Sequence, residues 1–197
     1  MQINEKLNLV FPISENGPTC YHVPISREVF EANYRTIAAA KSSMMSKGAL
    51  FMVSSGPRIA VLTLMDEGRK ESAERGEFDG ENNPLDGGVL ALLAEIRRLT
   101  TILCPSGAGW NMLPVDTAIA NGAIDEDDWR ETESAIVFFT CNCALARKAE
   151  RKSVMQGTAS VLKGSITSLA PMEFINSLPT LTKTDASATS QASSLPS

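Results

Sequence analysis

Three groups of side chains in the sequence have residue types that catalytic or metal sites use. His22 is the single histidine and falls in a predicted strand, where a lone histidine is more often structural than a catalytic base. Cys141 and Cys143 fall in a helical pattern, in which positions i and i+2 point roughly 200° apart. Since both thiolates cannot bind one metal ion without breaking that helix, the pattern favours two buried, apolar cysteines.

The third group is the acidic run from Asp125 to Asp128. It lacks the Asp-x-Asp-x-Asp-Gly pattern with a distal glutamate that calcium loops use, and acidic residues are favoured where a helix begins. The glycine pairs in 87–88 and 107–109 belong to no phosphate-binding motif. The sequence therefore predicts no catalytic residue, no cofactor and no metal ion. A small enzyme that uses the acidic run with a divalent metal is the rival interpretation.

Charge and hydropathy exclude further classes. The 197 residues include 18 Lys and Arg against 23 Asp and Glu, and the resulting net charge of −5 makes nucleic acid an improbable ligand. The longest apolar stretches, 49–53 and 59–65, are too short for a transmembrane helix. The first residues do not have the pattern of a signal peptide, and four cysteines do not make a disulfide framework, so a cytoplasmic protein with reduced thiols is expected.

The elements that position these groups are mostly helical in pattern. Residues 7–25 predict a β-hairpin, because two short apolar runs flank the turn-forming Asn16-Gly17-Pro18. Helical spacing then predicts a helix over 27–47, capped by Ser26 and ended by Gly48 in the left-handed conformation. The remaining predicted segments are a helix from 55–57 to about 71, a charged loop over 76–88, a helix over 89–103 ended by Pro105, a connector over 106–114 and a short helix over 115–121.

The longest predicted helix begins at Asp125 and ends among Arg147, Lys148, Arg151 and Lys152. Its middle, 135–141, is apolar nearly all round, which predicts the central core helix. Two short helices are expected over 154–162 and 171–178. Residues 179–197 are rich in Ser and Thr and are predicted to be a disordered tail. The predicted fold class is therefore mainly α: one helical domain over 1–178 with an N-terminal β-hairpin, followed by that tail.

Three segments of the sequence, taken together, are similar to a known family. They are 23–30 (VPISREVF), 95–100 (EIRRLT) with Gly109-Trp110 after it, and 124–128 (IDEDD) leading to 135–140 (AIVFFT). The chain, up to about residue 179, resembles the tail assembly chaperones of long-tailed, lambda-like bacteriophages. The loop over 76–88 looks like an insertion relative to that family.

The resemblance implies a non-enzymatic helper, located in the host cytoplasm and absent from the mature virion. It would bind the tape measure protein and keep it soluble until tail tube protein replaces the helper. Repeated modest contacts along a long partner favour a homo-oligomer. Phe174, Ile175 and Leu178 form the candidate partner-binding patch, with docking on the domain itself as the alternative. The alternative function is a minor virion structural protein of the tail or of the head-tail junction.

Overall fold

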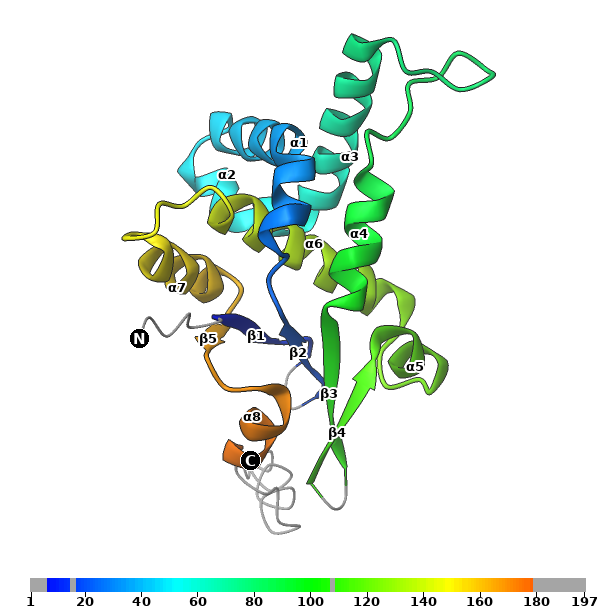
Figure 1. Ribbon diagram of the computed structural model, residues 1–197. Coiled ribbons are helices and arrows are strands. Elements are labelled where there is room, and N and C mark those ends of the chain that lie inside the picture. Colours follow the sequence, from blue (N-terminus) through cyan, green and yellow to red (C-terminus); the bar gives the residue numbers. More distant parts are fainter. Residues whose placement is uncertain (1–6, 15–16, 107–108, 179–197) are drawn as a thin grey trace, which may run out of the picture.

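A β-sheet with helices on its two faces organises the chain (Figure 1). The structure is a computed structural model that describes residues 7–14, 17–106 and 109–178. Along the chain the elements are β1 (Asn8–Pro12), β2 (Thr19–His22), α1 (Arg27–Ser46), α2 (Ala49–Ser54), α3 (Gly56–Arg75), α4 (Val89–Arg98), β3 (Thr100–Ser106), β4 (Gly109–Pro114), α5 (Val115–Ala120), α6 (Glu126–Cys143), α7 (Arg151–Val161), β5 (Ser165–Thr167) and α8 (Pro171–Ser177).

The five strands pair antiparallel in the order β4-β3-β2-β1-β5. The predicted fold class, a mainly α domain with an N-terminal β-hairpin, is therefore wrong, and the fold is mixed α/β. The hairpin itself is confirmed, since Leu9 pairs with His22 and Pro12 with Thr19. It forms the middle of the sheet, and the strands on either side of it come from residues after 99.

The strand β3 replaces the last part of a predicted helix. The helix expected over 89–103 ends at Arg98, and Thr100 already pairs with His22 on β2. The sequence from Thr100 to Cys104 is apolar and β-branched, so it suits a strand that is buried on both faces. Pro105 lies beyond the last pair of β3 with β2 and pairs only with Trp110 on β4, where its missing N–H is tolerated.

Alternate residues of the strands supply two cores. Leu9 and Ile102 belong to the core between the sheet and the helices, whereas Val10, Tyr21 and Leu103 point to the face on which α8 lies. The prediction of a central core helix is confirmed, because the residues of α6 from 134 to 141 are all buried. This helix packs against α1, α3, α4 and α7.

Helix ends follow the predicted signals in part. The Ser26 hydroxyl accepts a hydrogen bond from the Val29 amide at 3.2 Å, so the predicted start of α1 is confirmed. Gly48 has φ 92° and ψ 163°, which starts α2 instead of closing α1 in the left-handed helical conformation. The long helix begins as predicted but ends at Cys143, and Arg151 starts α7. The predicted tail, 179–197, lies outside the described residues.

Candidate functional site

The single histidine is a fully buried, neutral side chain. The Thr100 hydroxyl donates its one hydrogen to the Ile96 carbonyl oxygen at 2.7 Å, so at 3.0 Å from His22 it must accept the proton of Nδ1. His22 Nε2 is then unprotonated, and it is buried without a hydrogen-bond partner among the residues that the structure describes. Because burial removes water from the ring, it lowers the pKa of His22 from 6.5 to about 3. This geometry fits a structural residue of the core.

The four cysteines are free thiols and all are buried. Burial raises the pKa of Cys141 to about 12 and that of Cys143 to about 11, so neither is a reactive thiolate near neutral pH. Within the described residues, no group of three or more His, Cys, Asp and Glu side chains is placed to hold a metal ion.

The acidic run is a helix start. The Asp125 carboxylate accepts a hydrogen bond from the Asp128 amide at 2.7 Å, and the Asp128 carboxylate accepts one from the Asp125 amide at 3.1 Å. This reciprocal pair is a capping box, and it satisfies two amides that the helix cannot pair internally. Asp127 forms an exposed ion pair with Arg130 at 3.0 Å. The local geometry accounts for the acidic run without a ligand.

The predicted partner-binding patch lies on the sheet. Phe174 and Ile175 on α8, both half-buried, pack against the core formed by Val10, Tyr21 and Leu103. The rings of Phe174 and Tyr21 are 6.0 Å apart between centroids and tilted by 53°. The Tyr21 hydroxyl donates a hydrogen bond to the Leu169 carbonyl oxygen at 2.6 Å and so holds the segment that leads into α8. Leu178, half-buried, follows directly after α8. The structure thus docks Phe174 and Ile175 on the domain, which is the alternative that the sequence left open; their binding of a partner stays a prediction.

A groove of about 890 Å³ lies beside the hairpin, where Leu7 and five further parts of the chain meet. Its walls are the connection from β2 to α1, the first turn of α1, and the C-terminal ends of α4 and α6, together with α7. Most of the lining side chains are apolar, namely Leu7, Val23, Pro24, Ile25, Phe30, Leu99, Phe139, Ala144 and Met155. Its volume falls in the range typical of ligand sites, which are roughly 300 to 1,000 Å³.

Charged side chains border this groove in pairs of opposite sign. Arg27 donates to Glu31 at 2.6 Å, and Arg98 donates to Glu95 at 2.7 Å. The hydrogen bond from Arg98 is the main cause that lowers the pKa of Glu95. An apolar floor with a charged border is the arrangement expected of a site that binds one face of an amphipathic segment.

Helix α2 forms a second apolar surface, which we define by Met45, Leu50, Phe51 and Val53 and call the α2 surface. No residue of α2 is buried, although its sequence is ALFMVS. Leu50 is 84% exposed, and Val53 and Met45 are each more than half exposed. The ammonium of Lys47 lies 5.0 Å from the centroid of the Phe51 ring. Three of these four side chains therefore have more than half of their surface exposed to solvent.

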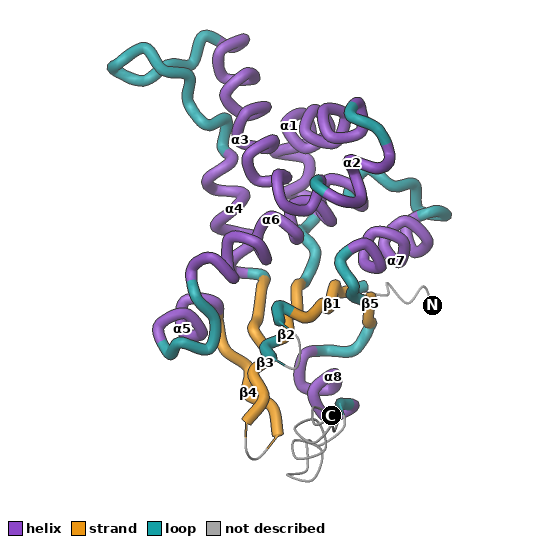
Figure 2. The backbone as a smooth tube through the Cα atoms, turned by 180° about the vertical axis from the view of Figure 1, so that it is seen from behind, coloured by secondary structure: helices purple, strands orange, loops and turns teal. Residues whose placement is uncertain are grey.

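The predicted loop over 76–88 is an ordered projection, which we call the acidic arm. Figures 1 and 2 show it standing away from the helices, beyond the end of α3. Phe78 and Pro84 form a β-bridge across it, and the Asp79 carboxylate accepts hydrogen bonds from the amides of Glu81 and Asn83 at 2.9 and 2.8 Å. These hydrogen bonds lower the pKa of Asp79, that from the Asn83 backbone most.

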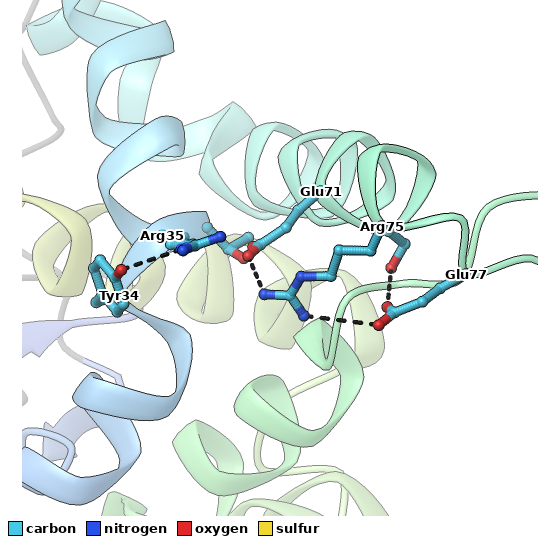
Figure 3. A network of polar contacts seen from close by, with 7 residues as sticks. Tyr34, Arg35, Glu71, Arg75 and Glu77 are labelled. Carbon is cyan, nitrogen blue, oxygen red and sulfur yellow. Dashed lines mark hydrogen bonds and ion pairs between the residues drawn. The ribbon is translucent and has the colours of Figure 1, made fainter.

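A polar network fixes the base of the acidic arm (Figure 3). Glu77 accepts a hydrogen bond from the Ser72 hydroxyl at 3.3 Å and lies 3.9 Å from the Arg75 guanidinium. Arg75 also pairs with Glu71, and Glu71 accepts a hydrogen bond from Thr36 on α1 at 2.6 Å. Side chains of α1 and α3 thus set the direction in which the arm leaves the helices.

Sequence reasoning did not identify the groove or the fixed shape of the arm, which it treated as a solvated loop. Around α2 it noted the apolar stretch 49–53, and it interpreted Met44, Met45 and Met52 as core side chains with an adaptable binding surface as the alternative. The groove had one signal in the sequence, because two of the three segments with the family resemblance, 23–30 and 95–100, supply much of its lining, and the third supplies Phe139 and Thr140.

In the described part of the chain, no helix is both long enough and apolar enough to cross a membrane. Comparison of the chain with protein-family models, with curated proteins and with solved structures finds no match.

Proposed function

We propose that the chain is a non-enzymatic assembly chaperone of a long-tailed bacteriophage. It acts in the host cytoplasm, binds the tape measure protein while the tail is built, and leaves before the virion is complete. On this proposal tail tube protein displaces the chaperone from its partner.

The observation that supports the proposal is the composition of the groove. The three segments that resemble the chaperone family are far apart in the sequence, yet residues of all three line the same groove. Val23 to Arg27 and Phe30 come from the first segment, Arg98 and Leu99 from the second, and Phe139 from the third. If the family shares one binding site, the segments that resemble it should meet at that site, and here residues of all three line one apolar groove.

The groove offers large apolar side chains to a helical partner. Ile25 and Phe30 occupy the two positions of a hydrophobic staple around the Ser26 cap, and both side chains line the groove. A partner side chain as large as Leu or Phe contributes roughly 1.5 to 3 kcal/mol when fully buried. Several such side chains at helical spacing give a modest affinity at each site, which permits later displacement.

Co-expression with the tape measure protein of the same genome tests the proposal. We expect a soluble complex with several copies of the chain on each partner, measured by affinity capture and light scattering. The groove variant Ile25→Glu should abolish the complex, because it places an unpaired carboxylate among apolar side chains. Leu90→Glu is the matched control, since Leu90 is exposed and lies outside the groove lining.

Two results would overturn the proposal. One is a tape measure protein that stays insoluble and uncaptured in the presence of the wild-type chain. The other is abundant chain in purified virions by mass spectrometry, which would favour the minor structural protein instead. Thermal unfolding of Ile25→Glu alone must show a folded protein before its loss of binding is interpreted.

A further inference from the structure

The turn that leads from α6 into α7 carries a concentration of positive charge. Residues 147–152 include four basic side chains and one acidic one, Glu150, in a chain whose net charge is −5. We call the four basic residues, Arg147, Lys148, Arg151 and Lys152, the basic cluster. All four are exposed, and none of them forms an ion pair with another described residue. Their charge is therefore not neutralised by the described part of the chain.

The basic cluster adjoins the groove through Arg151. This side chain lines the groove together with Met155, one helical turn further along α7. The other two arginines of the lining, Arg27 and Arg98, are already paired with glutamates, as described above. Figures 1 and 2 show α7 and α4 on opposite sides of the connection from β2 to α1. The uncompensated positive charge thus lies at the α7 side of the groove, whereas the charges at the α4 side are paired.

The basic cluster is unfavourable for the fold of the chain by itself. The Arg151 amide donates a hydrogen bond to the Arg147 carbonyl oxygen at 2.9 Å, so these two residues are one helical turn apart. Lys148 and Lys152 have the same spacing, and like charges at this spacing repel each other. The start of α7 has no acidic residue in its first turn and no side-chain cap, although the start of a helix favours negative charge. Carboxylates of a partner would remove both unfavourable effects.

We propose that the groove selects amphipathic helices that carry carboxylates in their last turn. The apolar face of such a helix packs on the apolar floor of the groove, and its carboxylates lie against the basic cluster. This proposal rests on the proposed function, because it names the chemistry of the segment that the groove binds. The C-terminal end of a helix is also the negative end of its dipole, so one end of the partner supplies both kinds of negative charge. The basic cluster thereby fixes the direction in which the partner lies, and it makes binding weaker in high salt.

Three helical peptides with one apolar face test the proposal. Each has about 18 residues, or five helical turns, with leucine at helical spacing and an amidated C-terminus. The last turn contains two glutamates in the first peptide, two glutamines in the second and two lysines in the third. Fluorescence anisotropy measures their binding to the full chain. We expect the glutamate peptide to bind roughly tenfold more tightly than the glutamine peptide at low salt, from two exposed ion pairs, and the lysine peptide to bind most weakly.

Variants of the chain assign this preference to the basic cluster. Arg151→Gln with Lys152→Gln should abolish the preference for the glutamate peptide and leave binding of the glutamine peptide unchanged. Lys47→Gln with Arg69→Gln is the matched control, because it changes the net charge equally at exposed residues outside the groove lining. Thermal unfolding should show the cluster variant to be at least as stable as the wild type, since it removes like charges from the start of α7. A merely structural role of these residues would instead lower stability.

A reversal of charge gives the sharpest result. Arg151→Glu with Lys152→Glu should bind the lysine peptide more tightly than the glutamate peptide. Equal binding of the three peptides to the wild type would overturn the proposal, as would absence of binding by all three. A cluster variant that keeps the preference would also overturn it. If the cluster binds single-stranded DNA or vesicles of phosphatidylserine and phosphatidylcholine, with no preference among the peptides, it serves another class of partner and the proposal fails.

The peptides replace the tape measure protein in this test, so failure of this proposal is distinguishable from failure of the proposed function. Three peptides that bind equally, and that Ile25→Glu no longer binds, would show a groove without charge selection and leave the proposed function standing. Preferential binding of the glutamate peptide, by a chain that does not capture the tape measure protein, would support the charge selection and overturn the proposed function.

Discussion

Acidification should destabilise the fold through one side chain, His22. Its Nε2 is buried and has no hydrogen-bond partner in the described part of the chain, and its Nδ1 already donates to Thr100. A proton added to Nε2 would create a buried charge whose new N–H has no acceptor. The folded chain therefore excludes the proton that the unfolded chain accepts.

The direction and the magnitude of the change in stability with pH follow from the pKa of His22 in the unfolded and in the folded chain. The pKa of His22 falls from 6.5 to about 3 on folding, so the unfolded state binds more protons at any pH below about 6.5. Stability from this group is complete at pH values well above 6.5 and is lost progressively as the pH falls through 6.5 toward 3. Between the two pKa values each pH unit costs about 1.4 kcal/mol, which predicts a loss of about 2 kcal/mol at pH 5 and roughly 4 kcal/mol at pH 3.

Urea unfolding followed by circular dichroism, at pH 7.5, 6.5, 5.5 and 5.0, measures this loss. The comparison protein is His22→Asn, whose amide retains a donor toward Thr100 but does not titrate. We expect this variant to be less stable than the wild type at pH 7.5, because it leaves a void, and to show a smaller loss between pH 6.5 and 5.0. Carboxylates titrate in both proteins, so the difference between their slopes reports on His22.

Parallel loss of stability in the two proteins would refute the reasoning. A second measurement does not depend on the variant: the ring signals of His22, the only histidine, are followed by NMR in the wild-type chain. They should remain those of the neutral ring down to pH 5, and a midpoint near 6.5 in the folded protein would contradict the buried tautomer described above.

Three further predictions concern local structure. Asp125→Ala removes half of the capping box and should lower the free energy of unfolding by about 1 kcal/mol in a urea titration, with no response to a chelator in either protein. Gly68→Ala places a Cβ against the Asp86 carbonyl oxygen, so it should cost about 2 kcal/mol or more and loosen the arm, measured by hydrogen exchange. Cys141 and Cys143 should resist iodoacetamide at pH 8 in the folded chain and react once it is unfolded in urea, because burial raises their pKa values.

Local signals predicted the helices that carry their own caps. Ser26 and Asp125 each supply an oxygen to an amide three positions later, and such a contact depends only on nearby residues. The start of α1 and the start of α6 were therefore available from the sequence. The hairpin could be predicted for the same reason, since its turn residues and both of its strands lie within 7–25.

The pairing of strands that lie far apart in the chain could not be predicted from the sequence. Thr100 and Leu103 continue the three- and four-residue spacing of α4, so periodicity extended that helix through what is β3. The preference for a strand comes from β2, whose Cys20 pairs with Ile102 across more than 80 positions of sequence. The groove was hidden for the same reason, because its residues come together only when α1, α4, α6 and α7 have packed.

The place of β5 in the sheet bears on how the chain folds as it is synthesised. Leu9 of β1 pairs with Ile166 of β5, 157 positions later. At ~5 to 20 residues per second, a ribosome needs roughly 8 to 30 s to make the residues between them. Throughout that time β1 has an open edge that can pair with the same edge of another nascent chain. The three residues of β5 then cover that edge of β1, so nascent chains held close together on one message are exposed to mispairing there until β5 is made.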